Sequence, residues 1–388
     1  MTRLVHFLSG IRSEYDILAP VIDAVEATPG LEAAVVVTGA HLTRRYGLSV
    51  RQIEADGRRI AARIDSLLAS DELSGRVKGA ALQLAGLTDL FARERPDFLV
   101  VMGDREESLT GATAALYHHI PVVHLGGGDH AEDGNVDNPV RHAVTKLSHL
   151  HMATTELSAR RLRLLGEEDW RIRVVGASGL DRLLSTPEMD RAALDAALGV
   201  DWAGAPYAVL LYHPTITDFR DAQAHMGAIA QALEQSGLFV AAMAPNSDPG
   251  NDGVAAGIAA LAARCPRVRA FSFLERRVFV NLLRHAAVMV GNSSAGILEA
   301  PTLGLPAINV GMRQRGREHA DNVIFTGYAP AEIAAAIATA TTDAAFRTRV
   351  AGRRSPYGDG TAGRRIADAL AETETGPPLM RKPFLMER

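Results

Sequence analysis

Six clusters of glycine, charged and hydroxyl residues recur along the 388-residue sequence, most of them directly after a short apolar run. The densest cluster spans residues 124–138 and reads HLGGGDHAEDGNVDN. Its glycines let the backbone approach a ligand closely. Its carboxylates, Asp129, Glu132, Asp133 and Asp137, suit acid–base chemistry because crowding raises the pKa of some of them. A divalent-cation site and a solvated loop are the alternatives for the same residues.

The helix that follows this acidic cluster brings further charges. Arg141 comes four residues after Asp137, so the two side chains can meet on one helix face. His142 and Lys146 lie on the same predicted helix. We therefore expect Arg141 to take part in the same site as the acidic cluster.

Two clusters have the pattern of an anion site. Residues 10–15 (GIRSEY) form a glycine turn before a helix, where Arg12 and the helix N-terminus favour phosphate. Residues 291–294 (GNSS) also precede a helix, so Ser293 and Ser294 can cap that helix or bind phosphate. Glu299 follows about one turn later, and we expect it to accept hydrogen bonds from ribose hydroxyls. A plain turn and simple helix capping are the alternatives.

Charged and histidine residues complete the set at other predicted strand ends. Asp104 and Arg105 form a Gly-Asp-Arg turn, which suits either ligand binding or a local ion pair. His41 and His213 each follow an apolar run, and Pro214 fixes an extended bend after His213. Its place at a strand end facing the predicted cleft makes His213 a better catalytic candidate than His118 or His119. Two more candidates lie in the second half of the chain. They are Asn246, and Arg313 with its neighbouring arginines, which suit a diphosphate or form a solvated charged run.

The elements that must position these residues are apolar strands alternating with amphipathic helices, which is typical of parallel α/β folds. Strands are predicted at residues 4–8, 33–38, 98–102, 122–125, 150–153, 208–212, 239–244, 268–271, 288–290 and 307–310. Helices are predicted at 17–27, 75–94, 109–117, 139–148, 221–235, 254–263, 277–285, 296–303, 330–341 and 362–372.

This order predicts two doubly wound, Rossmann-like α/β domains, at residues 1–185 and 186–360, with 186–206 as the interdomain region. The tail, residues 361–388, is expected to pack back onto the first domain. Two such domains predict a cleft at the carboxyl ends of both sheets, which is where open parallel sheets bind ligands.

Composition narrows the class of function. Hydrophobic residues make up 47% of the chain and the formal net charge is −4, so no overall positive field points to nucleic acid. The only cysteine, Cys265, excludes an intramolecular disulfide and fits a reducing compartment. The first apolar run is too short for a signal peptide, and no stretch has the length of a membrane span. We therefore expect a cytosolic protein that does not bind membranes.

Together the motifs resemble the hydrolysing UDP-N-acetylglucosamine 2-epimerases of sialic acid biosynthesis. The likeness rests on His124-Leu125-Gly126-Gly127, RHAVTKLSH at 141–149, Gly103-Asp104-Arg105, GNSS with Glu299, and RQRGR at 313–317, and it runs from about residue 3 to 323. It implies the two-domain fold of the GT-B glycosyltransferases, a homodimer or homotetramer, and a UDP-sugar substrate. It implies neither a cofactor nor a metal ion, and no convincing metal-ligand spacing is present.

The resemblance also implies roles for single residues. UDP would be held by Arg12, Asn246, Ser293, Ser294, Glu299 and Arg313. His213 would lie near the scissile bond, and the sugar would be surrounded by Asp104, Arg105, His41, Arg141 and the acidic cluster. Asp129 or Asp137 is the predicted base for the C2 proton, and Asp104, Glu132 and His213 complete the predicted catalytic group.

Three positions depart from the family pattern. The family commonly has an acidic or imidazole residue at the position of Gly126, a glutamate at Asp129, and a second aspartate at Asn138. These departures leave open a different sugar, and a UDP-2,4-diacetamido-2,4,6-trideoxy sugar of legionaminic acid synthesis is the alternative. A GT-B glycosyltransferase, a non-hydrolysing epimerase and a nucleotide-sugar-binding regulator without turnover are the competing functions.

Overall fold

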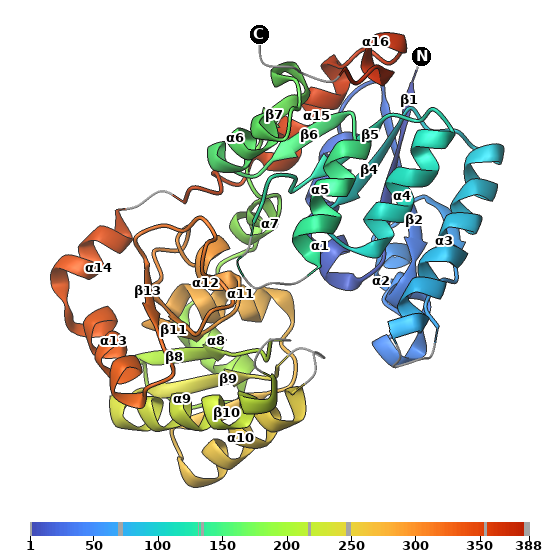
Figure 1. The fold of residues 1–388 in the computed structure, drawn as a ribbon. Helices are drawn as coiled ribbons and strands as arrows, with labels where there is room; N and C mark the ends of the chain where they lie inside the picture. The colour runs from blue at the N-terminus through green and yellow to red at the C-terminus, as the bar shows by residue number, and fades with distance from the viewer. Residues whose placement is uncertain are drawn as a thin grey trace. The chain divides into compact units, whose positions relative to one another are not determined.

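The structure is a computed structural model of the 388-residue chain, and it describes residues 2–68, 73–130, 132, 136–215, 219–245, 250–352 and 355–383. By their mutual contacts the residues separate into two units. The first contains Met1–His130, Val136–Arg182 and Tyr357–Arg388, and the second contains Ala131–Asn135 and Leu183–Pro356. Each unit is built around its own parallel sheet (Figure 1).

The first unit has a seven-stranded parallel sheet in the order β3-β2-β1-β4-β5-β6-β7. The strands are β1 (Arg3–Ser9), β2 (Leu31–Thr38), β3 (Ile60–Ile64), β4 (Phe98–Met102), β5 (Val122–Leu125), β6 (Leu150–Ala153) and β7 (Ile172–Val174). The side chains of β4 alternate between two cores, since Phe98 and Val100 lie in one and Leu99 and Val101 in the other. This central strand is therefore apolar on both faces, as expected for a parallel sheet covered on both sides.

Helices cover both faces of this sheet. Helices α1 (Arg12–Glu26) and α15 (Ala362–Glu372) contribute to one core, and α3 (Leu73–Arg93), α4 (Glu106–Tyr117) and α5 (Asp137–Leu147) contribute to the other. The remaining helices of this part of the chain are α2 (Val50–Ala55), α6 (Glu156–Leu164), α7 (Gly179–Ser185) and α16 (Pro377–Met380).

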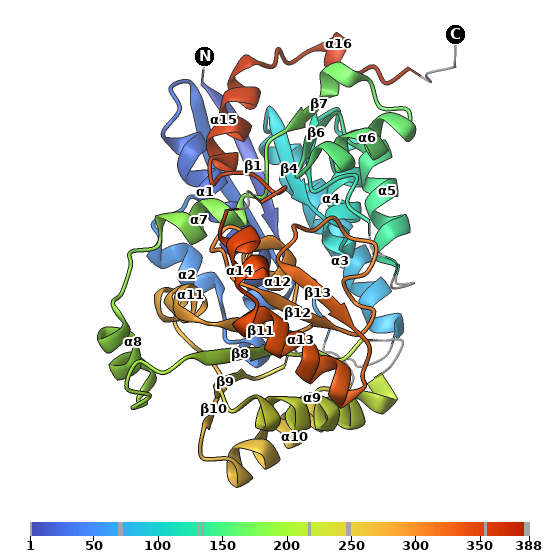
Figure 2. The ribbon, with the colours of Figure 1, turned by 90° about the vertical axis from the view of Figure 1, so that its left-hand side faces the viewer.

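The C-terminal helix α15 lies beside α1 in the first unit (Figure 2). The carboxylate of Asp181 accepts hydrogen bonds from the first N–H groups of α15, those of Ala362 (3.0 Å) and Gly363 (2.6 Å). At the other end, Arg3 donates to the carbonyls of Ala371 and Thr373, both at 2.6 Å. Both ends of the helix thus have partners for backbone groups that a helix leaves unpaired.

The second unit has a six-stranded parallel sheet in the order β10-β9-β8-β11-β12-β13. The strands are β8 (Tyr207–Leu211), β9 (Phe239–Met243), β10 (Val268–Phe271), β11 (Val288–Gly291), β12 (Ala307–Val310) and β13 (Val323–Thr326). One core is formed with α9 (Ala222–Ser236), α10 (Asn251–Arg264), α13 (Pro330–Thr342) and α14 (Ala344–Ala351), and the other with α8 (Arg191–Leu198), α11 (Arg276–His285) and α12 (Ala295–Leu298).

The prediction of two doubly wound α/β parts is confirmed, and all ten predicted strands are present with shifts of at most two residues at an end. Strands β3, β7 and β13 were not predicted. They lie at sheet edges and are only three to five residues long, so each gives a weak signal in the sequence.

Two other predictions were wrong in detail. The helix predicted at 296–303 ends at Leu298, because Pro301 cannot continue a helix and Gly304 adopts a left-handed φ of +64°. The predicted interdomain region, 186–206, contains α8, which begins with an Asp190 side-chain cap and ends at Gly199 with φ +63°. Leu194 and Leu198 of α8 are buried in a core of the second unit.

In the described part of the chain, no helix has the length and apolar character needed to cross a membrane.

Candidate active site

Each sheet has a point at which the strand order reverses, and several of the candidate residues follow the strands on either side of it. In the first sheet the reversal lies between β1 and β4, and in the second between β8 and β11. Open parallel sheets bind ligands beyond the carboxyl ends of the strands at this point. Arg12 and Asp104 follow β1 and β4, while His213 and Ser293 follow β8 and β11.

In the second unit, a single buried amide joins the loops after β8 and β11. Asn292 is 1% exposed. Its Oδ1 accepts a hydrogen bond from the backbone N–H of His213 (2.8 Å), and its Nδ2 donates to the carbonyl of the same residue (2.7 Å). Both bonds are to backbone, so they fix the position of His213 without involving its ring.

The loop after β12 is attached to the same residue. The backbone carbonyl of Asn292 accepts hydrogen bonds from Arg313 Nη1 (3.2 Å) and Gln314 Nε2 (2.9 Å). Burial and the neighbouring positive charge of Arg313 lower the pKa of His213 to about 4. The imidazole is therefore neutral at pH 7, and the Arg313 guanidinium supplies the positive charge in this region.

The serines and Glu299 lie around the short helix α12. Ser294 is its N-cap residue, and Ser293 Oγ accepts a weak hydrogen bond from the N–H of Ala295 (3.4 Å). Both serines are half-buried. Glu299 follows the last residue of α12, and burial raises its pKa while the positive charge of Arg276 lowers it.

Gly291, which ends β11, allows this tight arrangement. Its φ is +140°, and a Cβ atom there would lie 2.0 Å from the carbonyl oxygen of Leu211. Only glycine fits this approach of β11 to β8 without movement of the backbone.

In the first unit, Asp129 is the best-fixed carboxylate of the acidic cluster. Its Oδ1 accepts hydrogen bonds from the hydroxyls of Thr154 and Ser158, both at 2.7 Å. Among the described residues, nothing donates to its other oxygen, Oδ2. The carboxylate is thus held in one orientation and keeps an oxygen for a proton or a ligand.

Arg141 connects Asp129 with Asp104. Its guanidinium donates to the carbonyl of Asp129 (2.9 Å) and to Asn138 Oδ1 (3.1 Å), and it forms an ion pair with the carboxylate of Asp104. The structure therefore brings together Asp104, Asp129 and Arg141, whereas the sequence had suggested Asp137 as the partner of Arg141. Asp137, the first residue of α5, is half-buried.

His124 contacts the same region through both of its ring nitrogens. Its Nε2 is 2.8 Å from the carbonyl of Gly103, and its Nδ1 is 3.2 Å from the hydroxyl of Thr145 on α5. The ring is fully buried, and burial lowers the pKa of His124 to about 3. A neutral imidazole thus links the turn before Asp104 to the helix that carries Arg141.

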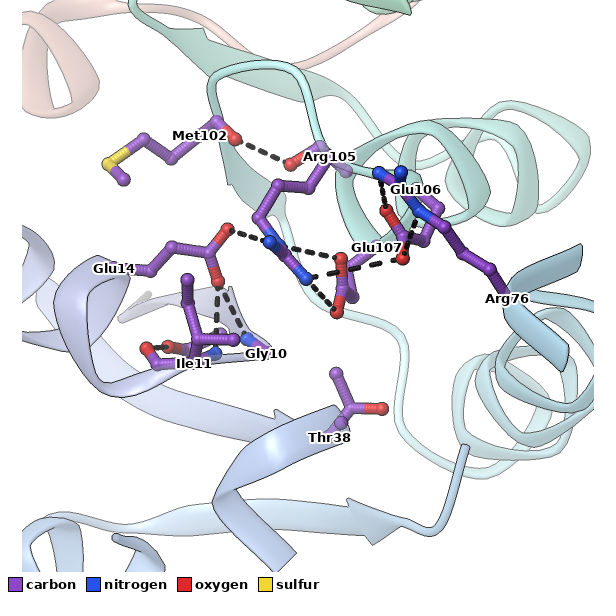
Figure 3. A network of polar contacts seen from close by, with 12 residues as sticks. Gly10, Ile11, Glu14, Thr38, Arg76, Met102, Arg105, Glu106 and Glu107 are labelled. Carbon is purple, nitrogen blue, oxygen red and sulfur yellow. Dashed lines mark hydrogen bonds and ion pairs between the residues drawn. The ribbon is translucent and has the colours of Figure 1, made fainter. Parts of the chain in front are cut away.

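Two predicted sugar contacts have other partners in the structure. His41 is fully buried, with Nε2 2.9 Å from Ser9 Oγ and Nδ1 2.8 Å from Ser49 Oγ. Arg105 pairs with Glu107, as Figure 3 shows, with Nε 3.0 Å from Oε2. This geometry favours a structural role for both residues over the predicted contact with a sugar. Arg12, in contrast, is exposed at the start of α1.

For three other predicted site residues, the structure gives little information about contacts. Glu132 is exposed. Asp133 and Asn246 lie outside the described residues. Within the described residues, no group of three or more His, Cys, Asp or Glu side chains is arranged to hold a metal ion.

Among known protein families, the model described as UDP-N-acetylglucosamine 2-epimerase matches residues 23–371. This chain belongs to the UDP-N-acetylglucosamine 2-epimerase family. The match covers both units, so it includes the loops at both points of strand reversal except the loop that carries Arg12.

Relatives of this 2-epimerase family member in Legionella pneumophila and Neisseria meningitidis match most of its length. One, from Legionella pneumophila, is named UDP-N,N'-diacetylbacillosamine 2-epimerase (hydrolyzing) and is 36% identical over 84% of this chain and 85% of its own. The other, from Neisseria meningitidis serogroup B, is named UDP-N-acetylglucosamine 2-epimerase and is 31% identical over 83% of each chain.

A solved structure shows the same fold. The UDP-GlcNAc 2-epimerase of Neisseria meningitidis bound to UDP-GlcNAc matches with a TM-score of 0.82, 19% identity, and coverage of 95% of this chain and 100% of that one. The predicted fold class, two parallel-sheet α/β units of GT-B-like type, is thereby confirmed for this 2-epimerase family member.

Several residues that shape the site were not among the sequence candidates. They are Asn292, Gln314, His124, Thr154, Ser158, Glu14 and Glu107. Asn292 stands inside the GNSS motif, and Thr154 and Ser158 follow the strand β6, so their places at strand ends were the available signal. Their partners are distant in sequence, and only the folded chain reveals those.

Proposed function

We propose that this family member is a hydrolysing 2-epimerase, which releases UDP from UDP-N-acetylglucosamine and inverts C2 of the sugar to give free N-acetylmannosamine. The observation that carries the proposal is the Asp129 carboxylate, which two hydroxyls fix next to the Asp104–Arg141 ion pair. The name of the Legionella relative, which includes "hydrolyzing", adds support.

The first proposed step is departure of UDP. The bond between C1 and the diphosphate oxygen breaks, and both of its electrons leave with UDP. Positive charge develops at C1, which acidifies the C2–H bond. Arg313, the hydroxyls of Ser293 and Ser294, and Arg12 would stabilise the negative charge of the leaving diphosphate.

The second proposed step is proton removal. Asp129 or Asp137 takes the C2 proton as a general base, and the C–H electrons form the C1–C2 double bond of a glycal. Water then adds its hydroxyl at C1, and C2 receives a proton on the opposite face. Asp104, Glu132 and neutral His213 are the proposed donors and acceptors of protons, and such help is typically worth about 10²–10⁴-fold in rate.

The same reaction on a diacetamido sugar is a second candidate. The Legionella relative is named for UDP-N,N'-diacetylbacillosamine, which is a 2,4-diacetamido-2,4,6-trideoxy sugar nucleotide. Gly126, where relatives of the sialic acid type commonly have a larger residue, has no atom within 4 Å of the position that a Cβ would take. The name of the Legionella relative is what supports this second candidate.

Product analysis in D₂O tests the reaction. The protein is incubated with each of the two UDP-sugars, and the products are identified by NMR. We expect free sugar with inverted C2 that carries deuterium at C2, together with an equal amount of UDP. Free sugar without deuterium would rule out the elimination step.

The other functions predict different products. A glycosyltransferase would release no free sugar without an acceptor, and a non-hydrolysing epimerase would return UDP-sugar. Binding without any product would support a regulator. Comparison of kcat/KM for the two UDP-sugars identifies the preferred substrate.

A single substitution tests Asp129 itself. Asp129→Asn preserves shape and keeps an acceptor for Thr154 and Ser158, but it removes the base, so turnover should fall by about 10²-fold or more while UDP affinity stays within about twofold. The control is Asp169→Asn, whose carboxylate is exposed and pairs with Arg163 in the same unit. Full activity of Asp129→Asn would remove Asp129 from the mechanism.

The resemblance also carries the expectation of a cytosolic homodimer or homotetramer. Light scattering of the purified protein measures the number of subunits.

A further inference from the structure

Three loops of the first unit meet at one buried carboxylate, Glu107. The loops follow β1, β2 and β4, and Glu107 lies at the start of α4 with 7% of its surface exposed. A Cβ atom on Gly10 would lie 2.7 Å from Glu107 Oε1, and one on Gly39 would lie 3.1 Å from the same oxygen. The two glycines therefore allow the first two loops to rest directly on the Glu107 side chain.

A second buried carboxylate, Glu14, holds the backbone of the loop after β1. Its Oε2 accepts hydrogen bonds from the N–H groups of Gly10 (2.8 Å) and Ile11 (3.3 Å). These are the two residues that precede Arg12. The position of the Arg12 backbone therefore depends on the Glu14 carboxylate, which is 5% exposed.

Arg105 joins the two carboxylates, as Figure 3 shows. Its Nε is 3.0 Å from Glu107 Oε2 and 3.8 Å from Glu14 Oε1, and its Nη2 is 3.2 Å from Glu107 Oε1. Asp104 immediately precedes Arg105 in the sequence. The guanidinium thus connects the loop that carries Asp104 to the loop that carries Arg12.

Burial of such charges is a costly way to stabilise a core. Well-packed apolar residues often replace a buried ion cluster with no loss of stability. Glu14 bonds to the backbone of the two residues before Arg12, and Arg105 directly follows Asp104. Glu107 pairs with Arg105, and the cluster lies at the point where the strand order reverses. This arrangement favours a role in positioning the site over a role in general stability.

We propose that Glu14, Arg105 and Glu107 form a clamp that positions Arg12 and Asp104 for the reaction proposed above. The three are positioning residues and need not touch the substrate. The clamp rests on the proposed function, since it is defined by its effect on turnover. It also assigns Arg105 a task other than sugar binding.

Steady-state kinetics test the clamp. Glu14→Gln and Glu107→Gln each replace a carboxyl group by an amide and keep the side-chain volume. We expect kcat to fall by about 10- to 100-fold in each, because small displacements of reacting groups cost about this much. The KM and the Kd for UDP should change by less than about threefold, because the residues proposed to bind the diphosphate lie mostly in the second unit.

The matched control is Arg76→Gln. Arg76 pairs with Glu106, the residue between Arg105 and Glu107, through two hydrogen bonds of 2.9 and 2.7 Å. Its side chain is 51% exposed and lies outside the clamp. Arg76→Gln should therefore keep the wild-type kcat.

Hydrogen exchange provides a readout that does not depend on turnover. In Glu14→Gln, amides of residues 4–18 should exchange at least about 10-fold faster, since the carboxylate that holds Gly10 and Ile11 is lost. Amides of residues 223–235, in the second unit, should exchange as in the wild type. This comparison separates local loosening from global unfolding.

Two results would overturn the clamp: wild-type kcat in both glutamine variants, or unchanged exchange of residues 4–18 in Glu14→Gln. Failure of the proposed function is distinguishable, because the wild type itself would then turn over neither UDP-sugar, and hydrogen exchange would still decide whether Glu14 holds the loop. Should Glu14→Gln not fold, Glu107→Gln tests the same clamp from its other side.

Discussion

Asn292→Ala is the substitution that most directly probes the second unit. The side chain makes two hydrogen bonds, of 2.8 and 2.7 Å, to the backbone of His213, and it is 1% exposed. Leaving a buried polar partner unsatisfied costs about 1–3 kcal/mol. Because His213 itself is half-buried and water can reach part of its surroundings, we take the lower half of that range for each of the two partners, and expect a loss of about 2–4 kcal/mol in the free energy of unfolding.

The same substitution should lower turnover. Without the Asn292 side chain, the loop that carries His213 loses its link to the end of β11, where Arg313 and Gln314 are attached. We expect kcat to fall by about 10-fold or more. Asn292→Asp should behave similarly, because it keeps the acceptor for the His213 N–H but places an oxygen against the His213 carbonyl.

Asn281→Ala is the matched control. Asn281 is also buried in the second unit, and it bonds only to residues outside the proposed site: it accepts from the N–H of Met189 (3.0 Å) and from Arg284 (3.3 Å), and donates to the carbonyls of Pro187 (3.0 Å) and Arg277 (2.8 Å). Urea unfolding should show similar losses of stability in the two alanine variants, whereas only Asn292→Ala should lose kcat. Equal loss of kcat in both, or none in Asn292→Ala, would refute the reasoning.

Three further outcomes are expected. Gly128→Ala should lower the free energy of unfolding by about 2–5 kcal/mol in urea, because the residue has φ +81° and its Cβ would lie 2.2 Å from the Ser158 carbonyl oxygen. Gly126→Ala is the control: with φ +76° and no atom within 4 Å of the Cβ position, it should lose only about 1 kcal/mol. Equal losses in the two variants would contradict the overlap with Ser158. Burial and the Glu107 charge raise the pKa of Glu14 from 4.5 to about 7, so the folded state binds this proton more tightly than the unfolded state, and the contribution of Glu14 to stability should fall as the pH rises from about 4.5 to about 7. Thermal unfolding of Glu14→Gln should lack this part of the pH dependence, and identical pH profiles would contradict the raised pKa. Asp181→Ala should lower the free energy of unfolding by about 1–2 kcal/mol, because it removes the cap of α15. Proteolysis should then release the C-terminal segment sooner than in the wild type, while kcat stays unchanged. A C-terminal segment no more sensitive to protease than in the wild type would argue against the cap.

The local pattern was sufficient for the central strands and for the places where chemistry gathers. Central parallel strands must be apolar on both faces, so β1, β4, β8 and β11 stand out in the sequence without any knowledge of their neighbours. Polar residues that directly follow such strands must lie at one edge of the sheet. For this reason the sequence alone was enough to select Asp104, Asp129, His213 and Ser293.

Signals for some missed elements were present but local context misled the prediction. Asp190 and Gly199 mark the two ends of α8, yet the polar stretch around them was interpreted as an interdomain region. Pro301 marked the early end of α12, but the apolar residues around it favoured a longer helix. The end of a helix or strand depends on single residues, whereas its presence is predicted from a pattern that many residues share.

The sequence by itself determined the class of fold, the family resemblance and the candidate residues, because each depends on residue type and order along the chain. Only the tertiary structure decided their partners. Arg105 had equal grounds to bind a ligand or to form an ion pair until the fold placed it between Glu14 and Glu107. His41 was a candidate contact until the fold buried it between Ser9 and Ser49. The residue type fixes the charge and the length of a side chain. Its burial and its partners depend on residues that can be hundreds of positions away in the sequence.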